Sequence, residues 1–365
     1  MISIIFGVKL LLYALILAGG KGTRLFPLSR AKNPKQFLKI INGKSFLQNT
    51  VDRIIPLVDR KNIYVVTNKE YISKVQEELL DINKQNIFAE PENKETATCI
   101  GFSAVKLLKK DPDATMIILP SDHYIENEKL FLDTISQAVQ IAERKRGLIT
   151  MGIKPVRPET GYGYIEMGEK IKSASATFKV ERFLEKPNIE VTKDLILKGT
   201  YLWNSGIFVW RADVFLREMQ KYLPKMYKCM LSMYQSLDTD REEEVVKEQY
   251  KIIDGISVDF GIMQKTRKAY VIKCDFFWDD IGTFTALGRL FKNFDGNNIK
   301  GNAVLQSSEN CTVFGNDKLI IMFGVKNLIV INCKDVLLIM DRNKDQELKY
   351  LVDRLKDKSN FKKYL

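Results

Sequence analysis

The sequence predicts an α/β protein in which helices cover both faces of a mostly parallel sheet, followed by a smaller β region. Three observations support this fold class. The hydrophobic share of 45% over 365 residues is enough for a large core. Short apolar runs alternate with amphipathic stretches through the first half of the chain. After residue 300, short β-branched runs separated by turn residues replace this alternation.

The first half of the chain is expected to contribute most of the main sheet. Strands are expected at residues 14–17, 63–67, 86–89, 116–119 and 148–152, and helices at residues 45–55, 69–80, 97–109 and 129–144. Because a helix separates most successive strands, the strands should run parallel. Ligands of such sheets bind beyond the carboxyl ends of the strands, so the loops after residues 17 and 119 are candidate binding loops.

The second half of the chain has a different pattern. Strands are expected at residues 161–166 and 179–186, and helices at residues 193–199, 213–221 and 241–249. Further short strands are expected at residues 312–313, 319–322, 328–331 and 336–339, before a terminal helix at residues 346–356. The spacing of the short strands fits either a small antiparallel sheet or the coils of a β-helix.

The first 18 residues are strongly apolar, apart from Lys9, and could be taken for a signal peptide. A positively charged region before the apolar run is missing, which argues against that interpretation. We therefore expect a buried first strand at residues 13–17 and an N-terminal arm at residues 1–12, unless the arm is a product of start-site choice. No later segment has the length and apolar character of a membrane span.

Charge and rare residue types narrow the function classes. The formal charge of +12 comes from lysines scattered along the chain, without basic runs that alternate with aromatic residues. A nucleic acid partner is therefore not expected. Five cysteines without a CxxC pair fit reduced thiols in a cytoplasmic protein. A single histidine, His123, excludes a zinc site made of several histidines.

The loop after the first strand predicts a site for a nucleoside triphosphate. Its glycines are Gly19, Gly20 and Gly22. Because they have no Cβ atom, backbone N–H groups can approach a phosphate chain, and Arg24 and Lys35 add positive charge. A Walker A loop is excluded because Leu15 occupies the position of its first glycine. The dinucleotide fingerprint is excluded because Leu25 occupies the position of its third glycine.

Two aspartates predict a divalent cation site. Asp122 follows the apolar strand at residues 116–119, and Asp280 lies in the segment 278–283. Mg²⁺ is typically held by one or two carboxylates together with phosphate oxygens and water. Either aspartate alone would more often cap a turn, but a triphosphate loop in the same chain favours the metal role. His123, beside Asp122, is expected to have a structural role.

Three segments in the middle of the chain carry polar groups that can bind a sugar phosphate. Glycines precede Glu166, Glu185 and Lys186 are adjacent, and Asn204 offers an amide that can bridge two hydroxyls. Neighbouring side chains on a strand point to opposite faces. Glu185 and Lys186 must therefore lie at a strand end or a bend if both contact one ligand.

These segments resemble those of the sugar-1-phosphate nucleotidyltransferases. Within that family, Leu28-Ser29-Arg30 and Pro34-Lys35-Gln36-Phe37 resemble the mannose-1-phosphate guanylyltransferase branch, and the resemblance covers roughly residues 13 to 350. It implies a Rossmann-like, GT-A-like domain at residues 13–290, a short left-handed β-helix at residues 291–345 and a helix or tail at residues 346–365. It also implies a homodimer.

The resemblance further implies transfer of GMP from GTP to mannose 1-phosphate, which gives GDP-mannose and pyrophosphate. The sugar phosphate would attack the α-phosphorus in line, with Mg²⁺ or another divalent cation. The implied catalytic residues are Arg24, Lys35, Asp122 and Asp280, and the two aspartates are the implied metal ligands. The implied nucleotide-binding residues are Leu17, Ala18, Gly19, Gly20, Gly22, Thr23, Arg24, Glu90, Thr96 and Ser121. The implied sugar-phosphate-binding residues are Gly163, Glu166, Glu185, Lys186 and Asn204.

The segment that resembles the base-binding loop, residues 90–97, departs from the family pattern at two positions. Glu95 stands where the family usually has Asn, and Asn93 stands where it usually has Gly. Guanine presents adjacent N1–H and N2–H₂ donors, which a carboxylate or a carbonyl can accept. Because of these departures, the resemblance does not carry guanine contacts over to Asn93 and Glu95.

Two other functions remain open from the sequence. The first is the same chemistry with glucose 1-phosphate and dTTP or UTP. The second is a non-catalytic sensor of nucleotide sugars. An acyltransferase in the C-terminal β region is disfavoured, because that region has few expected coils and no histidine.

Overall fold

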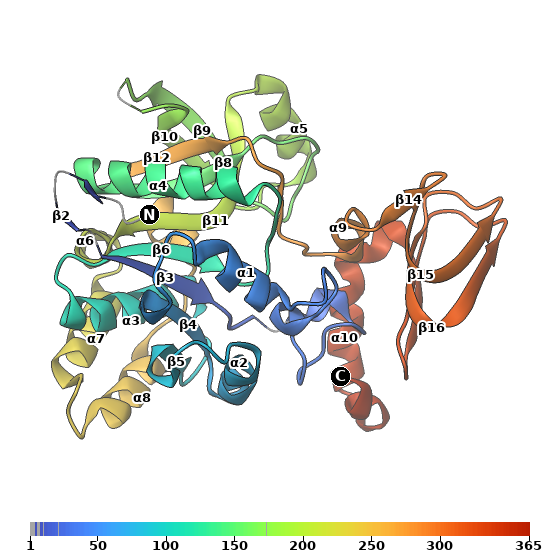
Figure 1. The fold of residues 1–365 in the computed structure, drawn as a ribbon, viewed down its shortest axis with the longest axis horizontal. Helices are drawn as coiled ribbons and strands as arrows, with labels where there is room; N and C mark the ends of the chain where they lie inside the picture. The colour runs from blue at the N-terminus through green and yellow to red at the C-terminus, as the bar shows by residue number, and fades with distance from the viewer. Residues whose placement is uncertain (1–3, 6–7, 10, 21, 173) are drawn as a thin grey trace. The chain divides into compact units, whose positions relative to one another are not determined.

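The computed structural model describes residues 4–5, 8–9, 11–20, 22–172 and 174–365. The chain forms two compact units, drawn together in Figure 1. The first unit contains Met1–Gly19, Gln48–Ser121 and Ile125–Trp278. The second contains Gly20–Leu47, Asp122–Tyr124 and Asp279–Leu365. Each unit is therefore assembled from segments that are far apart in the sequence.

The first unit is built on a nine-stranded sheet with the strand order β5-β4-β3-β6-β11-β8-β12-β10-β9. Its strands are β3 (Leu12–Leu17), β4 (Ile63–Asn68), β5 (Ile87–Glu90), β6 (Thr115–Pro120), β8 (Leu148–Ile153), β9 (Tyr164–Lys170), β10 (Thr177–Leu184), β11 (Tyr201–Arg211) and β12 (Ala269–Cys274). The central strands β3, β4 and β8 are almost entirely buried, because helices cover both faces.

The sheet is mixed, so the prediction of a mostly parallel sheet is wrong for its second half. β5, β4, β3 and β6 run parallel to one another, as expected. β11 runs antiparallel to both β6 and β8, and β9 and β10 form an antiparallel hairpin. β11 is buried along nearly its whole length on both faces, so its residue pattern carries no information about strand direction. The connection between β9 and β10 is also too short for a parallel crossover.

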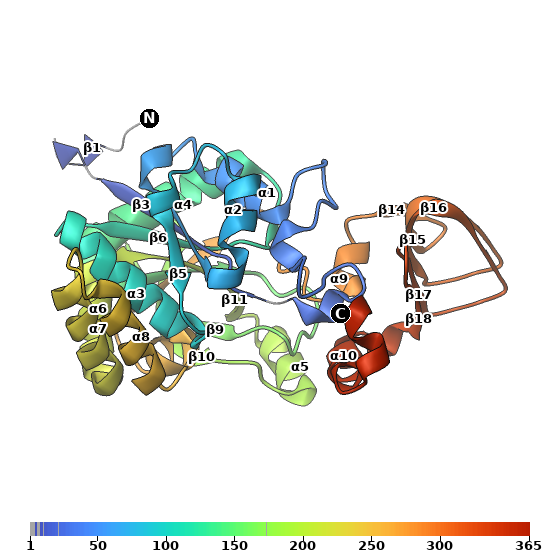
Figure 2. The ribbon, with the colours of Figure 1, turned by 90° about the horizontal axis from the view of Figure 1, so that it is seen from below.

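Helices lie on both faces of this sheet (Figure 2). One face is covered by α3 (Glu95–Lys110), α6 (Ala212–Tyr222), α7 (Pro224–Ser236) and α8 (Glu242–Ile252). The other carries α1 (Phe46–Ile54) and α4 (Glu128–Lys145), and α4 packs on β11, β8 and β12. The first unit is completed by α2 (Ile72–Glu78) and α5 (Ile189–Lys198). The alternation expected for the first half of the chain is confirmed, whereas α7, β11 and β12 have no counterpart among the expected elements.

The second unit contains a five-stranded sheet in the order β14-β15-β16-β17-β18. Its strands are β14 (Lys292–Phe294), β15 (Asn297–Gln306), β16 (Thr312–Phe323), β17 (Leu328–Asn332) and β18 (Leu337–Asp341). β15, β16 and β17 run parallel, like the successive turns of a β-helix, while β18 returns antiparallel. Gly301 has a φ of 114°, and a Cβ there would clash with the carbonyl oxygen of Gly315, so the chain can bend at this corner only with glycine.

Two apolar cores hold the second unit together. Inside the coils, Cys311, Val313, Met322 and Val330 pack together. On the outer side of β17, Ile329 and Ile331 belong to a core that also contains residues of α9 (Phe284–Gly288) and α10 (Leu348–Lys356). The expected terminal helix at residues 346–356 is therefore confirmed and packs against the coils.

Part of the expected N-terminal arm lies outside the described residues. In the expected N-terminal arm, residues 1–3, 6–7 and 10 lie outside them, while β1 (Ile4–Ile5) and β2 (Val8–Lys9) pair antiparallel. β7 (Tyr124–Ile125) and β13 (Trp278–Asp279) lie where the chain passes from one unit to the other. Among the described helices, none combines the length and apolar character needed to span a bilayer.

Candidate functional site

The loop after β3 is fixed to the end of β4 by three hydrogen bonds in the first unit. The Ala18 N–H donates to the carbonyl of Val66 (2.8 Å), and the Thr67 hydroxyl donates to the carbonyl of Ala18 (2.9 Å). The Asn68 amide donates to the carbonyl of Gly19 (3.1 Å). The backbone that leads from Leu17 into the glycine loop is therefore held in one conformation at the carboxyl edge of the sheet. Ser121, which directly follows β6, is tied to the end of β3, because its N–H donates to the Leu17 carbonyl (3.1 Å).

Glu90 ends β5, beside this loop, and is buried. The hydroxyl of Tyr250, on α8, donates to its Oε1 atom (3.1 Å). Burial raises the pKa of Glu90 to about 7, while hydrogen bonds from Tyr250 and Cys99 partly oppose the rise. The sequence indicated Glu90 through its family resemblance, but it offered no signal for Tyr250, which lies far away along the chain.

The start of α3 carries the departures from the family's base loop. Glu95 begins the helix with a φ of 64°, which is left-handed backbone. Asn adopts this conformation more readily than Glu, so the usual family residue suits the geometry better. The Thr96 hydroxyl accepts a hydrogen bond from the Val258 N–H (2.9 Å), which ties the helix start to the segment before Asp259.

A second group of polar residues lies in the same unit, around Asn204 on β11. The Asn204 amide donates to Oδ1 of Asp259 (3.0 Å), and its Oδ1 accepts from the Thr150 hydroxyl (3.0 Å). The carbonyl of Gly163 accepts from the Asn204 N–H (2.8 Å). A Cβ on Gly163 would approach Oε2 of Glu185 to 2.5 Å, so only glycine allows the carboxylate this position.

Glu185 and Lys186 meet at a bend just beyond β10. Lys186 has a φ of 47°, and its Nζ lies 2.6 Å from Oε1 of Glu185. The strand ends at Leu184, so the condition that both side chains lie at a strand end or bend is met. Glu166 has a different partner: it accepts from the Tyr201 hydroxyl, and Arg182 lies opposite it in the strand register of β9 and β10.

Asp259 is a site residue to which the sequence assigned no role. Burial and the neighbouring Glu185 carboxylate raise its pKa to about 7, although Lys186 and the Asn204 amide favour the ionised form. The segment 257–263 was noticed only as part of the family pattern. Its contact with Asn204 joins positions 55 residues apart in the chain, so spacing could not reveal it.

In the second unit, Lys35 joins the two aspartates proposed as metal ligands. Its Nζ lies 2.7 Å from Oδ2 of Asp122 and also donates to the backbone carbonyl of Asp280. The Lys35 side chain is buried. Desolvation disfavours the Asp122 carboxylate, but Lys35 and His123 outweigh that effect and hold the pKa of Asp122 below its usual range.

The backbone around Asp280 is strained. Ile281 is fully buried with a φ of 49°, which is unfavourable for a β-branched residue. Oδ1 of Asp280 accepts from the Gly282 N–H (2.9 Å). The neighbouring Asp279 is buried and forms an ion pair with Arg289, so it serves the structure of the unit.

The described part of the glycine loop in this unit leaves charge exposed. Gly22 has a φ of 60°, and a Cβ there would lie 2.6 Å from Cβ of Lys35, so the loop and Lys35 are in close contact. Arg24 follows Thr23 in a short 3-10 turn, Thr23–Leu25, and is exposed. Its guanidinium makes no ion pair with the described residues. Gly20 is exposed, and Lys21 lies outside the described residues.

Two carboxylates fit a hard cation such as Mg²⁺, which prefers oxygen ligands and keeps several waters or phosphate oxygens. The Lys35 ammonium contacts the carboxylate of Asp122 and the backbone carbonyl of Asp280, so these two residues, though not necessarily their carboxylates, are neighbours. No cluster of three or more His, Cys, Asp or Glu side chains suited to a metal occurs among the described residues. This donor set therefore fits a cation that also takes ligands from a phosphate substrate.

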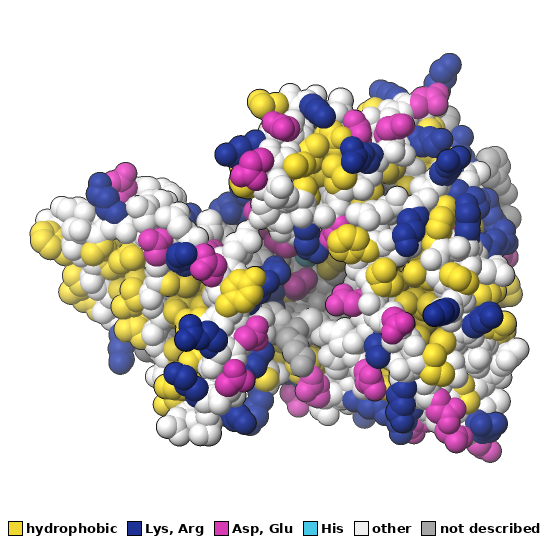
Figure 3. Space-filling model, turned by 180° about the vertical axis from the view of Figure 1, so that it is seen from behind, with side chains coloured by type: hydrophobic (Ala, Val, Ile, Leu, Met, Phe, Trp, Pro, Cys, Tyr) yellow, Lys and Arg dark blue, Asp and Glu magenta, His cyan; other side chains and the backbone are white. Residues whose placement is uncertain are grey.

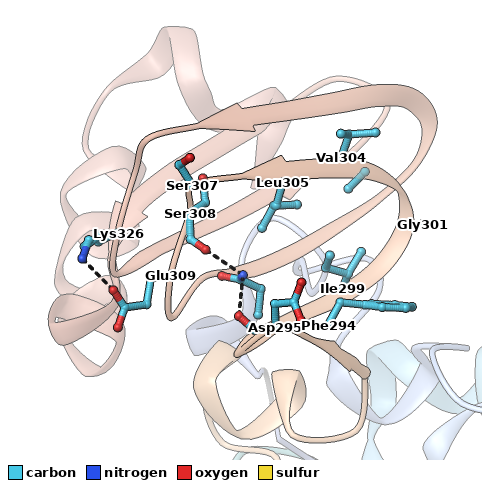
Figure 4. A pocket seen from close by; sticks show the side chains of 12 residues that line it. Phe294, Asp295, Ile299, Gly301, Val304, Leu305, Ser307, Ser308, Glu309 and Lys326 are labelled. Carbon is cyan, nitrogen blue, oxygen red and sulfur yellow. Dashed lines mark hydrogen bonds and ion pairs between the residues drawn. The ribbon is translucent and has the colours of Figure 1, made fainter.

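A separate open hollow of about 800 Å³ lies in the coil region of the second unit (Figure 4). Phe294, Ile299 and Leu305 form apolar parts of its wall. Some of its polar groups are paired with one another: Lys326 with Glu309 (2.6 Å), and the Asn297 amide with the Ser308 carbonyl (2.9 Å). None of the expected site residues lines it.

A glycine loop at the edge of a sheet, and a lysine that contacts one aspartate carboxylate and the backbone of a second aspartate, fit a nucleotidyl transferase. The Nucleotidyl transferase family matches residues 13–295 of this chain. A second family, the MannoseP isomerase/GMP-like beta-helix domain, matches residues 301–355. The chain thus has an α/β nucleotidyltransferase fold followed by a β-helix-like domain.

Curated relatives refine this assignment. The mannose-1-phosphate guanylyltransferase of Klebsiella pneumoniae is 36% identical over 361 residues, which cover 97% of this chain and 76% of that protein. The enzyme of the same name from Escherichia coli is 36% identical over 351 residues, which cover 95% and 74%. The chain belongs to the mannose-1-phosphate guanylyltransferase family.

A solved structure shares the fold over nearly the whole chain. It is titled mannose-1-phosphate geranyltransferase, comes from Thermus thermophilus and has a TM-score of 0.86 at 28% identity. The match covers 95% of this chain and 100% of that one. The similarity therefore includes both the nucleotidyltransferase region and the β-helix-like region.

Proposed function

We propose that this protein transfers GMP from GTP to mannose 1-phosphate and releases GDP-mannose and pyrophosphate. The observation that carries the proposal is membership of the mannose-1-phosphate guanylyltransferase family together with the Lys35–Asp122–Asp280 arrangement. A binding protein without catalysis would have no need to keep a buried ammonium against the Asp122 carboxylate and the Asp280 backbone beside a phosphate loop.

The proposed reaction is an in-line attack of a sugar phosphate oxygen on the α-phosphorus of GTP. The bond from the α-phosphorus to the bridging oxygen breaks, and pyrophosphate leaves with that electron pair. The attacking phosphate is already an anion at neutral pH, so no general base is required. The catalytic problem is the mutual repulsion of two anions, which positioning and charge neutralisation overcome.

In this proposal, the residues of the first unit bind the base and the sugar phosphate. The backbone from Leu17 to Gly19 is held rigid against β4 and lies beside Glu90, a carboxylate suited to a base edge. Glu185 and Asn204 would accept from or donate to hexose hydroxyls, and the exposed ammonium of Lys186 would bind the sugar phosphate. Glu166 would contact the hexose only if it left Tyr201.

The residues of the second unit would neutralise the triphosphate. Arg24 is exposed and free of ion pairs with described residues, so its guanidinium is available to phosphate oxygens. Lys35 balances the charge of Asp122 and would neutralise charge near the α-phosphate. Asp122 and Asp280 would hold Mg²⁺ or another divalent cation, which when bound supplies electrostatic stabilisation of the phosphates.

We also infer finer features of the fold and assembly. The four parallel strands β5, β4, β3 and β6 would form the Rossmann-like, nucleotide-binding part of a GT-A-like domain at residues 13–290. Residues 291–345 would form a left-handed β-helix, followed by the tail at residues 346–365. Residues 1–12 remain proposed as an N-terminal arm, and the location is proposed to be cytoplasmic.

A homodimer is proposed through the coil region. Val304, Ile321 and Phe323 are 53%, 69% and 70% exposed on the outer side of β15 and β16. Hydrophobic side chains gather over this part of the molecule in Figure 3. Apolar side chains exposed side by side in this way are typical of a protein interface.

The proposed activity is tested with a substrate panel. Purified protein is given GTP, ATP, UTP or dTTP, each with mannose 1-phosphate or glucose 1-phosphate, and pyrophosphate release is measured with Mg²⁺. The GTP and mannose 1-phosphate pair should have the highest kcat/KM. A preference for dTTP or UTP with glucose 1-phosphate would refute the guanylyltransferase assignment, and tight binding without turnover would refute the enzyme assignment.

A further inference from the structure

One buried polar atom beside the glycine loop lacks a hydrogen-bond partner. Asn68 ends β4, is only 9% exposed, and donates from its amide nitrogen to the Gly19 carbonyl (3.1 Å). Its Oδ1 atom is buried and has no partner among the described residues. Leaving such an acceptor unsatisfied destabilises the fold, so its retention calls for a donor beyond those that the described part of the chain supplies.

The orphaned oxygen of Asn68 faces the same space as the Glu90 carboxylate. A Cβ built on Gly19 would lie 3.8 Å from Oδ1 of Asn68 and 3.8 Å from Oε2 of Glu90. The three residues follow or end the adjacent parallel strands β3, β4 and β5. Two hydrogen-bond acceptors therefore flank the surface that the missing side chain of Gly19 leaves open.

Glu90 is held in place from the side opposite this surface. The Tyr250 hydroxyl donates to its Oε1 atom (3.1 Å), while Oε2 is the atom near Gly19. Tyr250 is fully buried, and its ring packs edge-on against Phe102 with centroids 5.8 Å apart. The groups that face Glu90 are Tyr250 on α8 and Cys99 on α3. Neither is charged at neutral pH, since burial raises both of their pKa values.

We propose that Asn68 and Glu90 together recognise the donor edge of guanine, and that Tyr250 is the positioning residue that aims the Glu90 carboxylate. The inference rests on the proposed function, since it assumes that GTP is the nucleotide. Guanine presents N1–H and the exocyclic N2–H₂ side by side, which matches two neighbouring acceptors. Adenine presents an acceptor at N1 and no amino group at C2, so it leaves both oxygens unpaired. Inosine keeps N1–H and lacks only the amino group.

The pair of acceptors is tested first by comparing GTP with ITP. The preference is the ratio of kcat/KM for GTP to kcat/KM for ITP, with mannose 1-phosphate as acceptor. We expect the wild-type protein to prefer GTP about tenfold or more, and Asn68→Ala to lose most of that preference, because a buried hydrogen bond contributes roughly that factor. A general disturbance of the loop would lower both rates and leave the ratio unchanged. Asn68→Ser provides a second variant if Asn68→Ala does not fold.

Tyr250 is tested by the pH dependence of GTP use. Removing the phenol donor in Tyr250→Phe should raise the pKa of Glu90, because that hydrogen bond stabilises the ionised carboxylate. The acid limb of kcat/KM for GTP should then shift to higher pH, with kcat at high pH nearly unchanged. Tyr13→Phe is the matched control: Tyr13 is also buried and bonded to a carboxylate, Asp111, at the opposite end of β3.

The outcomes separate this inference from the proposed function. If the wild-type protein makes no GDP-mannose from GTP, both fail. If it prefers GTP to ATP but uses ITP equally well, or if Asn68→Ala and Asn68→Ser keep the full GTP-to-ITP ratio, only the recognition by Asn68 and Glu90 is refuted. An unshifted acid limb in folded Tyr250→Phe refutes the positioning role.

Discussion

At the scale of single residues, the most informative contrast is between Lys35 and Arg24. Lys35 is buried and already paired with Asp122, whereas Arg24 is exposed without an ion pair to the described residues. Lys35 therefore has a structural role beside the chemical one proposed for it, since its removal would leave the Asp122 carboxylate without its counter-charge. Arg24 has no such structural duty, which makes it the cleaner test of the triphosphate site.

We predict that Arg24→Ala lowers kcat about 100-fold, the size typical of losing one charge-stabilising group in an active site. Because the side chain is exposed and makes no ion pair with described residues, folding should be unaffected. Pyrophosphate release gives the rate, and circular dichroism checks the fold. Arg60→Ala, at an exposed surface pair with Asp81, is the control that should keep full activity. Wild-type turnover in Arg24→Ala would contradict the assignment.

A second prediction concerns Asp259 and stability. Its pKa is raised to about 7, so the folded protein holds this proton more tightly than the unfolded chain does. The contribution of Asp259 to stability is therefore full at low pH and is lost as the pH rises through 7. Asp259→Asn should gain stability relative to wild type between pH 5 and pH 8, as measured by urea midpoints. Asp254 is an exposed neighbour, so the urea midpoint of the control Asp254→Asn should change with pH as that of the wild type does. The hypothesis is wrong if the midpoint of Asp259→Asn also follows the wild type.

At the scale of elements, the start of α3 combines an exposed Glu95 with left-handed backbone. Asn tolerates this conformation better than Gln does. The free energy of unfolding of Glu95→Asn should therefore exceed that of Glu95→Gln by about 0.5–1 kcal/mol, which a higher urea midpoint would show. Both variants remove the same charge at the helix start, so their difference isolates the backbone preference. Equal midpoints would show that the backbone strain is relieved in solution.

The sequence was sufficient to predict the elements that local patterns define. The alternation of β3, β4, β5 and β6 with helices follows from the spacing of apolar runs along the chain. The direction of β11 was not predictable, because a strand buried on both faces has the same pattern in either direction. Asn68, Tyr250 and Asp259 were missed for a related reason: their roles come from contacts between distant segments.

At the scale of the whole molecule, the chain is interleaved between its two units. The glycine loop begins in the first unit at Gly19 and continues in the second at Gly20, while Asp122 and Asp280 belong to the second. This interleaving could not be predicted from local sequence patterns, because it depends on contacts between distant segments.

The last prediction concerns the proposed homodimer. A stable interface buries about 800 Å² on each partner, and its centre is usually apolar. Ile321 and Phe323 are the most exposed of the three side chains on the outer side of β15 and β16, and they lie on one strand. The double variant Ile321→Glu and Phe323→Glu should therefore be monomeric, because dimerisation would bury two carboxylates in an apolar surface. Light scattering after size exclusion measures the mass.

The control Leu197→Glu, at an exposed leucine on α5, introduces a carboxylate on a different surface and should leave the dimer intact. A dimer that survives the double variant would place the interface on another surface.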